Sequence, residues 1–62
     1  MVSVEYIPDT ELGGYTARLP GIPAYGEGNT KEEAKADLKE AVMAYLESYG
    51  PDETLSEWLG GE

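Results

Sequence analysis

Carboxylates are the reactive side chains that this chain has in quantity, and they limit the chemistry that it could perform. The 62 residues include thirteen Asp and Glu and four Lys and Arg, but no His and no Cys. The chain therefore lacks the usual general base, the usual thiol nucleophile and the usual zinc ligands. An oxygen-ligand Mg²⁺ site remains formally available, because carboxylates are the donors that this ion prefers.

The spacing of the carboxylates does not favour such a site. No pair falls on a set of residues expected to face inward, and Glu32-Glu33 and Asp52-Glu53 are better explained as helix-start and turn residues. Gly26-x-Gly28 resembles a fragment of a phosphate-binding loop, but no Lys or full glycine pattern follows, so we interpret it as a tight turn. We expect no catalytic residue, no metal site and no cofactor, and we expect that the chain is not an enzyme.

The formal net charge of −9 restricts the class of partner. Binding to DNA or RNA requires clusters of Lys and Arg that neutralise phosphates, and this composition does not supply them. We therefore expect no direct nucleic-acid binding. The acidic balance favours attraction to a basic protein instead.

Length and hydropathy predict one small domain over residues 1–62. A domain of this size buries only about 60% of its unfolded surface, so we expect a homo-oligomer, a dimer or higher. No apolar run approaches the ~20 residues that a membrane span needs, and no signal peptide is visible. The sequence therefore predicts a cytoplasmic protein with no membrane partner.

Alternating side chains predict an antiparallel pair of strands at the start of the chain. Apolar and polar residues alternate over residues 2–7 and again over residues 15–19. Residues 8–14 contain Gly and Asp and predict a short loop, and a connection this short makes the strands antiparallel. Glu5 and Arg18 fall on the outward set of each strand, where they could form an ion pair.

A weaker strand and a strong helix follow. Residues 22–27 predict a third strand, with Pro23 at an edge or in an irregular entry, because proline cannot donate to a strand ladder. The helix is predicted over residues 31–49, and Gly50 suits the position just after its end. Thr30 is a good N-cap, and Glu33 could reach back to the Thr30 N–H to complete a capping box.

Three stripes run along this helix. One broad arc is apolar, which predicts the core face: Ala34, Leu38, Ala41, Val42, Tyr45, Leu46 and Tyr49. Lys31, Lys35 and Lys39 follow one border of that arc, and the opposite side is acidic. The acidic stripe is either a solvated face or a surface that meets a basic partner, and we take its members as the candidate partner-binding residues: Glu33, Asp37, Glu40 and Glu47.

The tail over residues 52–62 permits two interpretations. Thr54 and Glu57 have the spacing of a capping box for a short helix that holds Leu55, Trp58 and Leu59. The same residues could form a last strand, and we favour the helix. Trp58 and Leu59 are expected to cover the core of their own domain, the alternative being a subunit contact.

Three short motifs follow one another along the chain. Residues 14–15 are Gly-Tyr at the start of the second strand, residues 20–21 are a Pro-Gly turn, and residues 28–34 read Gly-Asn-Thr-Lys-Glu-Glu-Ala. In this order they resemble the HicB-like antitoxin family, whose helix opening is typically Gly-Asp-Thr-x-Glu-Glu-Ala. Asn29 stands where the family usually has Asp. The resemblance covers about residues 2–49.

The resemblance implies a fold and a function. The fold would be a partial ribonuclease-H-like domain of the α+β class, in which a three-stranded antiparallel sheet packs on one long helix, here with a short extra C-terminal element. The function would be neutralisation of a small basic HicA toxin, a messenger-RNA-cleaving enzyme. Many HicB-like proteins add a C-terminal DNA-binding segment, but the residues after Tyr49 leave no room for one, so we expect no promoter binding by this chain.

Two other functions stay open. One is a stand-alone homo-oligomeric protein of the same fold, with a structural or regulatory role and no toxin. The other is a minimal nuclease, which only the ribonuclease-H-like ancestry suggests. Glu5 is the sole acidic residue on the first strand, whereas a two-metal site requires several convergent carboxylates.

Overall fold

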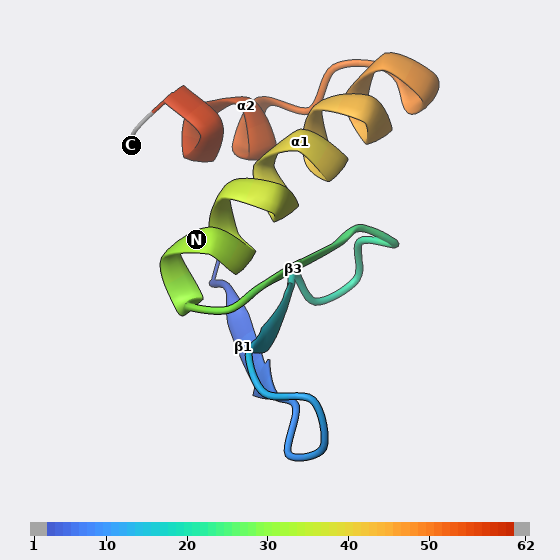
Figure 1. The fold of residues 1–62 in the computed structure, drawn as a ribbon. Coiled ribbons are helices and arrows are strands. Elements are labelled where there is room, and N and C mark those ends of the chain that lie inside the picture. The colour runs from blue at the N-terminus through green and yellow to red at the C-terminus, as the bar shows by residue number, and fades with distance from the viewer. Residues whose placement is uncertain (1–2, 61–62) are drawn as a thin grey trace.

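A computed structural model describes residues 3–60 as three strands followed by two helices (Figure 1). The strands form one antiparallel sheet in the order β1-β2-β3, and α1 packs on one face of it. This confirms the expected α+β fold with a short extra helix. Val2, predicted to open the first strand, lies outside the described residues. The elements are β1 (Glu5–Pro8), β2 (Tyr15–Arg18), β3 (Tyr25–Gly28), α1 (Lys31–Tyr49) and α2 (Glu53–Gly60).

The strand register assigns every strand residue to one of two faces. Residues opposite one another across the sheet share a face, and successive residues alternate between faces. The inner face, on which α1 packs, carries the rows Tyr6-Ala17-Gly26 and Pro8-Tyr15-Gly28, whereas the outer face carries Glu5-Arg18-Tyr25 and Ile7-Thr16-Glu27. Arg18 Nε lies 3.2 Å from Glu5 Oε1, which confirms the predicted ion pair. The Glu5 side chain is exposed and that of Arg18 is 38% exposed, so solvent screens the pair and it adds little stability.

Gly26 and Gly28 do not form the tight turn that the sequence predicted. Both lie in β3, and their missing side chains let the strand approach α1 directly. A Cβ built on Gly26 would lie 2.7 Å from the Leu38 Cα, and one built on Gly28 would lie 2.6 Å from the Ala34 N, so either would push strand and helix apart. The third strand therefore occupies residues 25–28 instead of 22–27, and Pro23 lies before it.

The first hairpin is held by a compact loop. Pro8 belongs to β1, although the sequence placed it in the loop. It lies on an edge strand, where its missing N–H costs no ladder bond. Asp9 organises the loop, because its Oδ1 accepts hydrogen bonds from the N–H groups of Glu11 and Leu12, both at 2.9 Å. Gly14, at φ 85°, closes the loop in a backbone conformation that favours glycine.

Helix α1 begins and ends at the predicted residues. Thr30 Oγ1 accepts a hydrogen bond from Glu33 N at 3.1 Å, which confirms the N-cap. The reciprocal bond differs from expectation, because Glu33 Oε1 accepts from Asn29 N, at 2.9 Å, and not from Thr30 N. At the other end Gly50, at φ 96°, donates its N–H to Leu46 O and ends the helix.

The core lies between the sheet, α1 and α2. Its buried residues come from all three layers: Ala17, Leu19, Ala24, Ala34, Leu38, Val42 and Leu55. Helix α2 confirms the helical interpretation of the tail, and Trp58 and Leu59 pack half-buried against this core. Its cap is Asp52, whose Oδ1 accepts from Leu55 N at 3.1 Å, and not Thr54.

One residue of the predicted core arc is not buried. Tyr49 is 75% exposed, because the last turn of α1 extends past the sheet. Its ring stacks on Tyr45 instead, with the ring centroids 4.8 Å apart. The arc is therefore a core face only over the part of α1 that crosses the strands, where Ala34, Leu38 and Val42 are buried.

Candidate functional site

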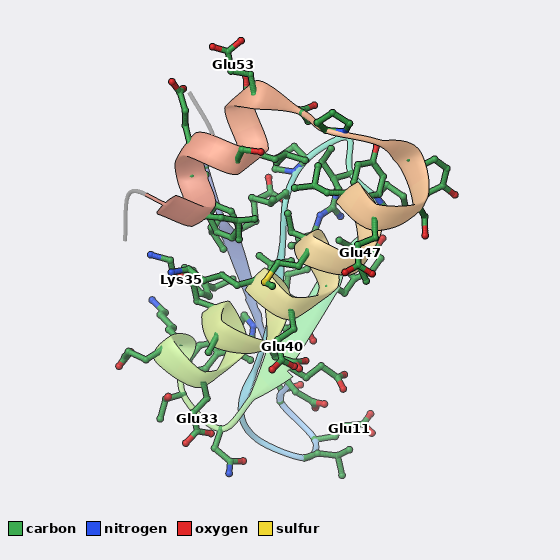
Figure 2. The ribbon with its side chains drawn as sticks, turned by 90° about the horizontal axis from the view of Figure 1, so that it is seen from above. Glu11, Glu33, Lys35, Glu40, Glu47 and Glu53 are labelled. Carbon is green, nitrogen blue, oxygen red and sulfur yellow. The ribbon has the colours of Figure 1, made fainter. Side chains whose placement is uncertain are left out.

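The four acidic residues predicted to bind a partner all lie on the exposed side of α1. In Figure 2, Glu33, Glu40 and Glu47 project from one side of the helix, and Lys35 projects from the other. This segregation follows from the helical period, since these acidic residues fall opposite the buried side chains of the same helix. The structure nevertheless divides the four into two pairs with different surroundings.

Glu33 and Asp37 are engaged within the domain. Asp37 Oδ2 accepts a hydrogen bond from Glu27 N at 2.9 Å, so a helix side chain satisfies a backbone donor of the edge strand β3. Glu33 accepts the Asn29 N–H as described above. Both carboxylates therefore stabilise the fold through hydrogen bonds, a role that the helical pattern alone did not reveal.

Glu40 and Glu47 play no comparable structural role within the described residues. Neither makes a hydrogen bond or ion pair with any residue in the described range 3–60. Residues three or four positions away on a helix are the natural ion-pair partners, but no Lys or Arg lies at that spacing from either glutamate. Their charges are therefore directed at solvent, or at a partner.

An exposed methionine lies between these two glutamates. Met43 is three residues after Glu40 and four residues before Glu47, and it is 55% exposed. Sequence reasoning missed it, because we considered only the apolar arc that faces the core. The spacing from the two glutamates was the signal that could have identified it. We call Glu40, Met43 and Glu47 the acidic helix patch.

Glu47 occupies an electrostatically unfavourable position. It lies in the last turn of α1, where the helix dipole presents its negative end, and no basic residue lies in that turn. A carboxylate there destabilises an isolated helix by a few tenths of a kcal/mol, roughly. A positive group from outside the domain would offset this cost.

The acidic helix patch can bind but offers no evident chemistry. Its exposed thioether supplies a flexible apolar contact, and the two carboxylates supply charge-assisted hydrogen bonds to Lys or Arg. An element that carries an apolar side chain flanked by basic residues would match all three groups. The arrangement therefore suits recognition of a basic protein surface.

The remaining acidic residues do not converge. Within residues 3–60, no group of three or more Asp, Glu, His or Cys is arranged to hold a metal ion. Glu5, the residue considered for nuclease chemistry, lies on the outer face of the sheet beside Arg18. Asp9, whose pKa is lowered by hydrogen bonds from the Leu12 and Glu11 backbone, lies in the first loop.

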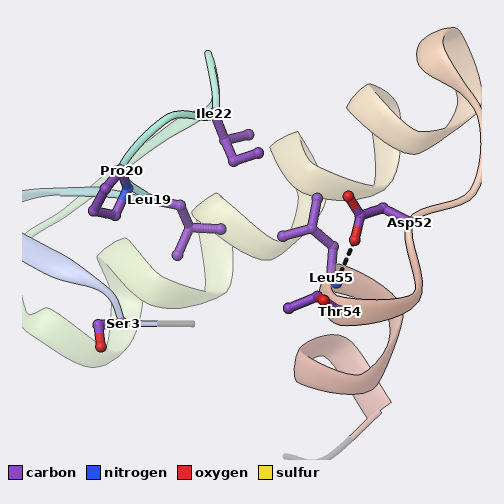
Figure 3. A pocket seen from close by; sticks show the side chains of 7 residues that line it. All are labelled: Ser3, Leu19, Pro20, Ile22, Asp52, Thr54 and Leu55. Carbon is purple, nitrogen blue, oxygen red and sulfur yellow. Dashed lines mark hydrogen bonds between the residues drawn. The ribbon is translucent and has the colours of Figure 1, made fainter. Parts of the chain in front are cut away.

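One groove of about 460 Å³ lies between the turn after β2 and the start of α2 (Figure 3). Its polar lining includes Asp52, but that carboxylate caps α2, as the dashed line to Leu55 shows. Most of its other lining residues are apolar, including the buried Leu19 and the partly buried Ile22. Its other polar side chains are the isolated hydroxyls of Ser3 and Thr54, which do not form a charged or convergent site.

No helix within the described part of the chain combines the length and the apolar character that crossing a bilayer demands.

Comparison with known proteins shows short similarities to two small relatives. The chain is 42% identical over 43 residues to the UPF0150 protein Ta0767 of Thermoplasma acidophilum, which is 68% of this chain and 62% of that protein. It is 50% identical over 42 residues to the UPF0150 protein ssl0738 of Synechocystis sp., 66% of this chain and 58% of that protein. The chain thus spans about three fifths of the length of these relatives. No family model and no solved structure matches it.

Proposed function

We propose that this protein is an antitoxin of HicB-like type, which binds and neutralises a small basic messenger-RNA-cleaving toxin of HicA type in the cytoplasm. Two observations support the assignment. The motifs at residues 14–15, 20–21 and 28–34 occur in the order of that family, and the sheet and helix have the arrangement that the resemblance implies. Similarity to UPF0150 proteins is compatible with it, although their names state no function.

The acidic helix patch carries the proposal. It presents two carboxylates that have no hydrogen-bond or ion-pair partner among residues 3–60, around an exposed methionine, and the helix bears an unfavourable charge at Glu47. A basic toxin would neutralise both carboxylates and cover Met43. The net charge of −9 would also steer such a toxin toward the protein over longer distances.

Co-expression with a basic HicA-type protein tests this function. We expect the two proteins to co-purify and the complex to have lost RNA-cleaving activity, because the antitoxin covers the RNA-binding surface of the toxin. A candidate toxin encoded beside this chain is the natural choice. Absence of binding, with full RNA cleavage in the mixture, would favour the alternative of a stand-alone homo-oligomeric protein.

Charge reversal distinguishes the proposed surface from general electrostatic attraction. The double variant Glu40→Lys/Glu47→Lys should lower toxin affinity about tenfold or more, which corresponds to about 1.4 kcal/mol or more. The matched control Glu11→Lys/Glu57→Lys changes net charge equally at exposed residues outside α1. Equal losses in both double variants would mean that overall charge, and not this patch, determines binding.

A further inference from the structure

The two edges of the sheet differ in what satisfies their backbone. At β3, the Glu27 N–H is bonded by Asp37, a side chain of α1. At β1, no side chain within residues 3–60 makes a comparable bond to the strand backbone. An edge strand with free backbone groups is a template on which another strand can pair. Within residues 3–60, the β1 edge is therefore the less protected of the two sheet edges.

The register identifies which groups point off this edge. Asp9 N donates to Gly14 O at 3.0 Å, one position beyond the Pro8–Tyr15 pair. Hydrogen-bonded pairs alternate in an antiparallel ladder, so Glu5 and Ile7 bond to β2 and the backbone groups of Tyr6 point outward. Pro8 shares the outward set, so its missing N–H falls on the open edge and leaves the ladder to β2 complete.

The charges around this edge are balanced, unlike those of the protein as a whole. Glu5 is paired with Arg18, and the Lys31 ammonium lies 5.6 Å from the ring centroids of both Tyr6 and Tyr15. Two of the four basic residues are therefore beside β1 or its neighbour. A chain of net charge −9 can meet a copy of itself with least repulsion where its own charge is neutralised.

Helix α1 also leaves the inner face at β1 partly uncovered. It packs over β3 and, to a lesser extent, over β2, because the glycines of β3 draw it toward that side of the sheet. Val4 and Tyr6 consequently remain half-buried at the margin of the core. A second sheet that continued from β1 would extend this inner face and cover part of this margin.

We propose that β1 pairs antiparallel with β1 of a second copy, around a two-fold axis at Tyr6, to form a continuous six-stranded sheet with both α1 helices on one face. In this register Tyr6 lies opposite Tyr6 of the partner subunit, and each donates its N–H to the other's carbonyl. Val4 lies opposite Pro8 of the partner subunit. The Val4 N–H donates to the carbonyl of that proline, which has no N–H to donate in return. The pairing uses every outward N–H from Val4 to Pro8, and in each copy only the Val4 carbonyl, which faces the proline nitrogen of the partner subunit, stays bonded to water.

The same register places Glu5 opposite Ile7 of the partner subunit, which permits a direct test. The chain has no cysteine, so Glu5→Cys and Ile7→Cys each carry a single thiol. Opposed residues of a non-hydrogen-bonded pair have Cα atoms about 4.5 Å apart, within disulfide range. Like residues lie diagonally, about 7–8 Å apart, which is too far for a relaxed disulfide.

Under mild oxidation, a mixture of the two cysteine variants should form disulfide-linked dimers much faster than either variant alone. Both positions are exposed on the outer face, so the substitutions leave the core intact. Equal rates in the mixture and in the separate variants would overturn the proposed register. No cross-link in any sample would overturn the pairing itself.

Sedimentation of edge variants provides the second test. Tyr6→Pro removes the outward N–H but no bond to β2, whereas Tyr6→Ala removes the same ring and keeps the N–H. We expect a dimer for the wild type, a weaker dimer for Tyr6→Ala, and a folded monomer by circular dichroism for Tyr6→Pro. A monomeric wild type at millimolar concentration, or a dimeric Tyr6→Pro, would refute the proposal; should Tyr6→Pro fail to fold, the cysteine pair decides. These experiments need no toxin, so their outcome is independent of the proposed antitoxin function.

Discussion

Asp37 on α1 accepts a hydrogen bond from the backbone N–H of Glu27 on β3, with the donor and acceptor atoms 2.9 Å apart. The bond joins the outside of the helix to the edge of the sheet, across ten residues of sequence. It satisfies one outward backbone donor at the β3 edge, whereas no side chain within residues 3–60 bonds to the backbone of β1. It also separates the acidic stripe into carboxylates that hold the fold and carboxylates that remain available to a partner.

Replacement of Asp37 should loosen β3. We expect Asp37→Ala to lower the free energy of unfolding by about 0.5–1.5 kcal/mol, because the Glu27 N–H loses its acceptor. Hydrogen exchange of the Glu27 amide should accelerate. Glu40→Ala is the matched control, since it also removes one exposed carboxylate from α1 but breaks no hydrogen bond within residues 3–60. An unchanged exchange rate at Glu27 in Asp37→Ala would contradict the role assigned to this carboxylate.

A methyl group at Gly26 should separate β3 from α1. Gly26→Ala places a Cβ against the backbone of Ala34 and Leu38, and such overpacking typically costs about 1–3 kcal/mol. Gly60→Ala serves as the control, because its Cβ meets nothing within 4 Å and alanine favours a helix. Chemical denaturation measures both. A Gly26→Ala variant as stable as the wild type would show that strand and helix are farther apart than described.

Truncation of leucine to alanine should strongly destabilise the protein in the core but have little effect in the first loop. Leu38 is fully buried, whereas Leu12 is 89% exposed at the tip of the first hairpin. Leu38→Ala should cost about 2–5 kcal/mol, which is enough to unfold so small a domain. Leu12→Ala should change the thermal midpoint very little. Similar losses in the two variants would mean that the core is assigned to the wrong residues.

The first loop should open at acidic pH. Hydrogen bonds from the Leu12 and Glu11 backbone hold the pKa of Asp9 below its ordinary value of 3.8. A lowered pKa in the folded state stabilises the loop fully above the unfolded value, and this contribution is lost as pH falls below 3.8 through the folded pKa. An NMR titration of the Glu11 and Leu12 amide shifts should report this step.

Asp9→Asn provides the control for that titration. Asparagine keeps the side-chain oxygen that accepts both hydrogen bonds but cannot titrate. The variant should therefore retain the loop conformation and lose the acid-dependent shift of the two amides. Persistence of the shift would assign it to another carboxyl group.

Glu47 should reduce stability while it aids binding. Glu47→Gln removes a negative charge from the negative end of α1, so the free energy of unfolding should rise by about 0.3–1 kcal/mol. Affinity for a basic toxin should fall in the same variant, as calorimetry would measure. Glu40→Gln, placed in the middle of the helix, should weaken binding without the gain in stability. Destabilisation by Glu47→Gln would point to an intramolecular partner.

Local features of the chain could be predicted because they depend on near neighbours. The bounds of α1, the Thr30 cap and the Gly50 end follow from hydrogen bonds within a few residues, and these are confirmed. The Glu5–Arg18 pair follows from strand alternation and a short connection. The acidic stripe likewise follows from the helical period.

The candidate site and the Asp37–Glu27 hydrogen bond depended on contacts between segments that are distant in sequence. Gly26 and Gly28 resemble a turn by composition, yet they lie in a strand because α1 must approach the sheet at that point. Tyr49 has the period of a core residue and is exposed, because the sheet is shorter than the helix. The sequence by itself determined which faces are apolar and which are acidic, since side-chain period is local. Only the tertiary structure decided that the Asp37 carboxylate is hydrogen-bonded within the domain, whereas Glu40, Met43 and Glu47 remain available to a partner. The physical reason is the placement of β3 beneath α1, which determines which carboxylates can reach a backbone N–H.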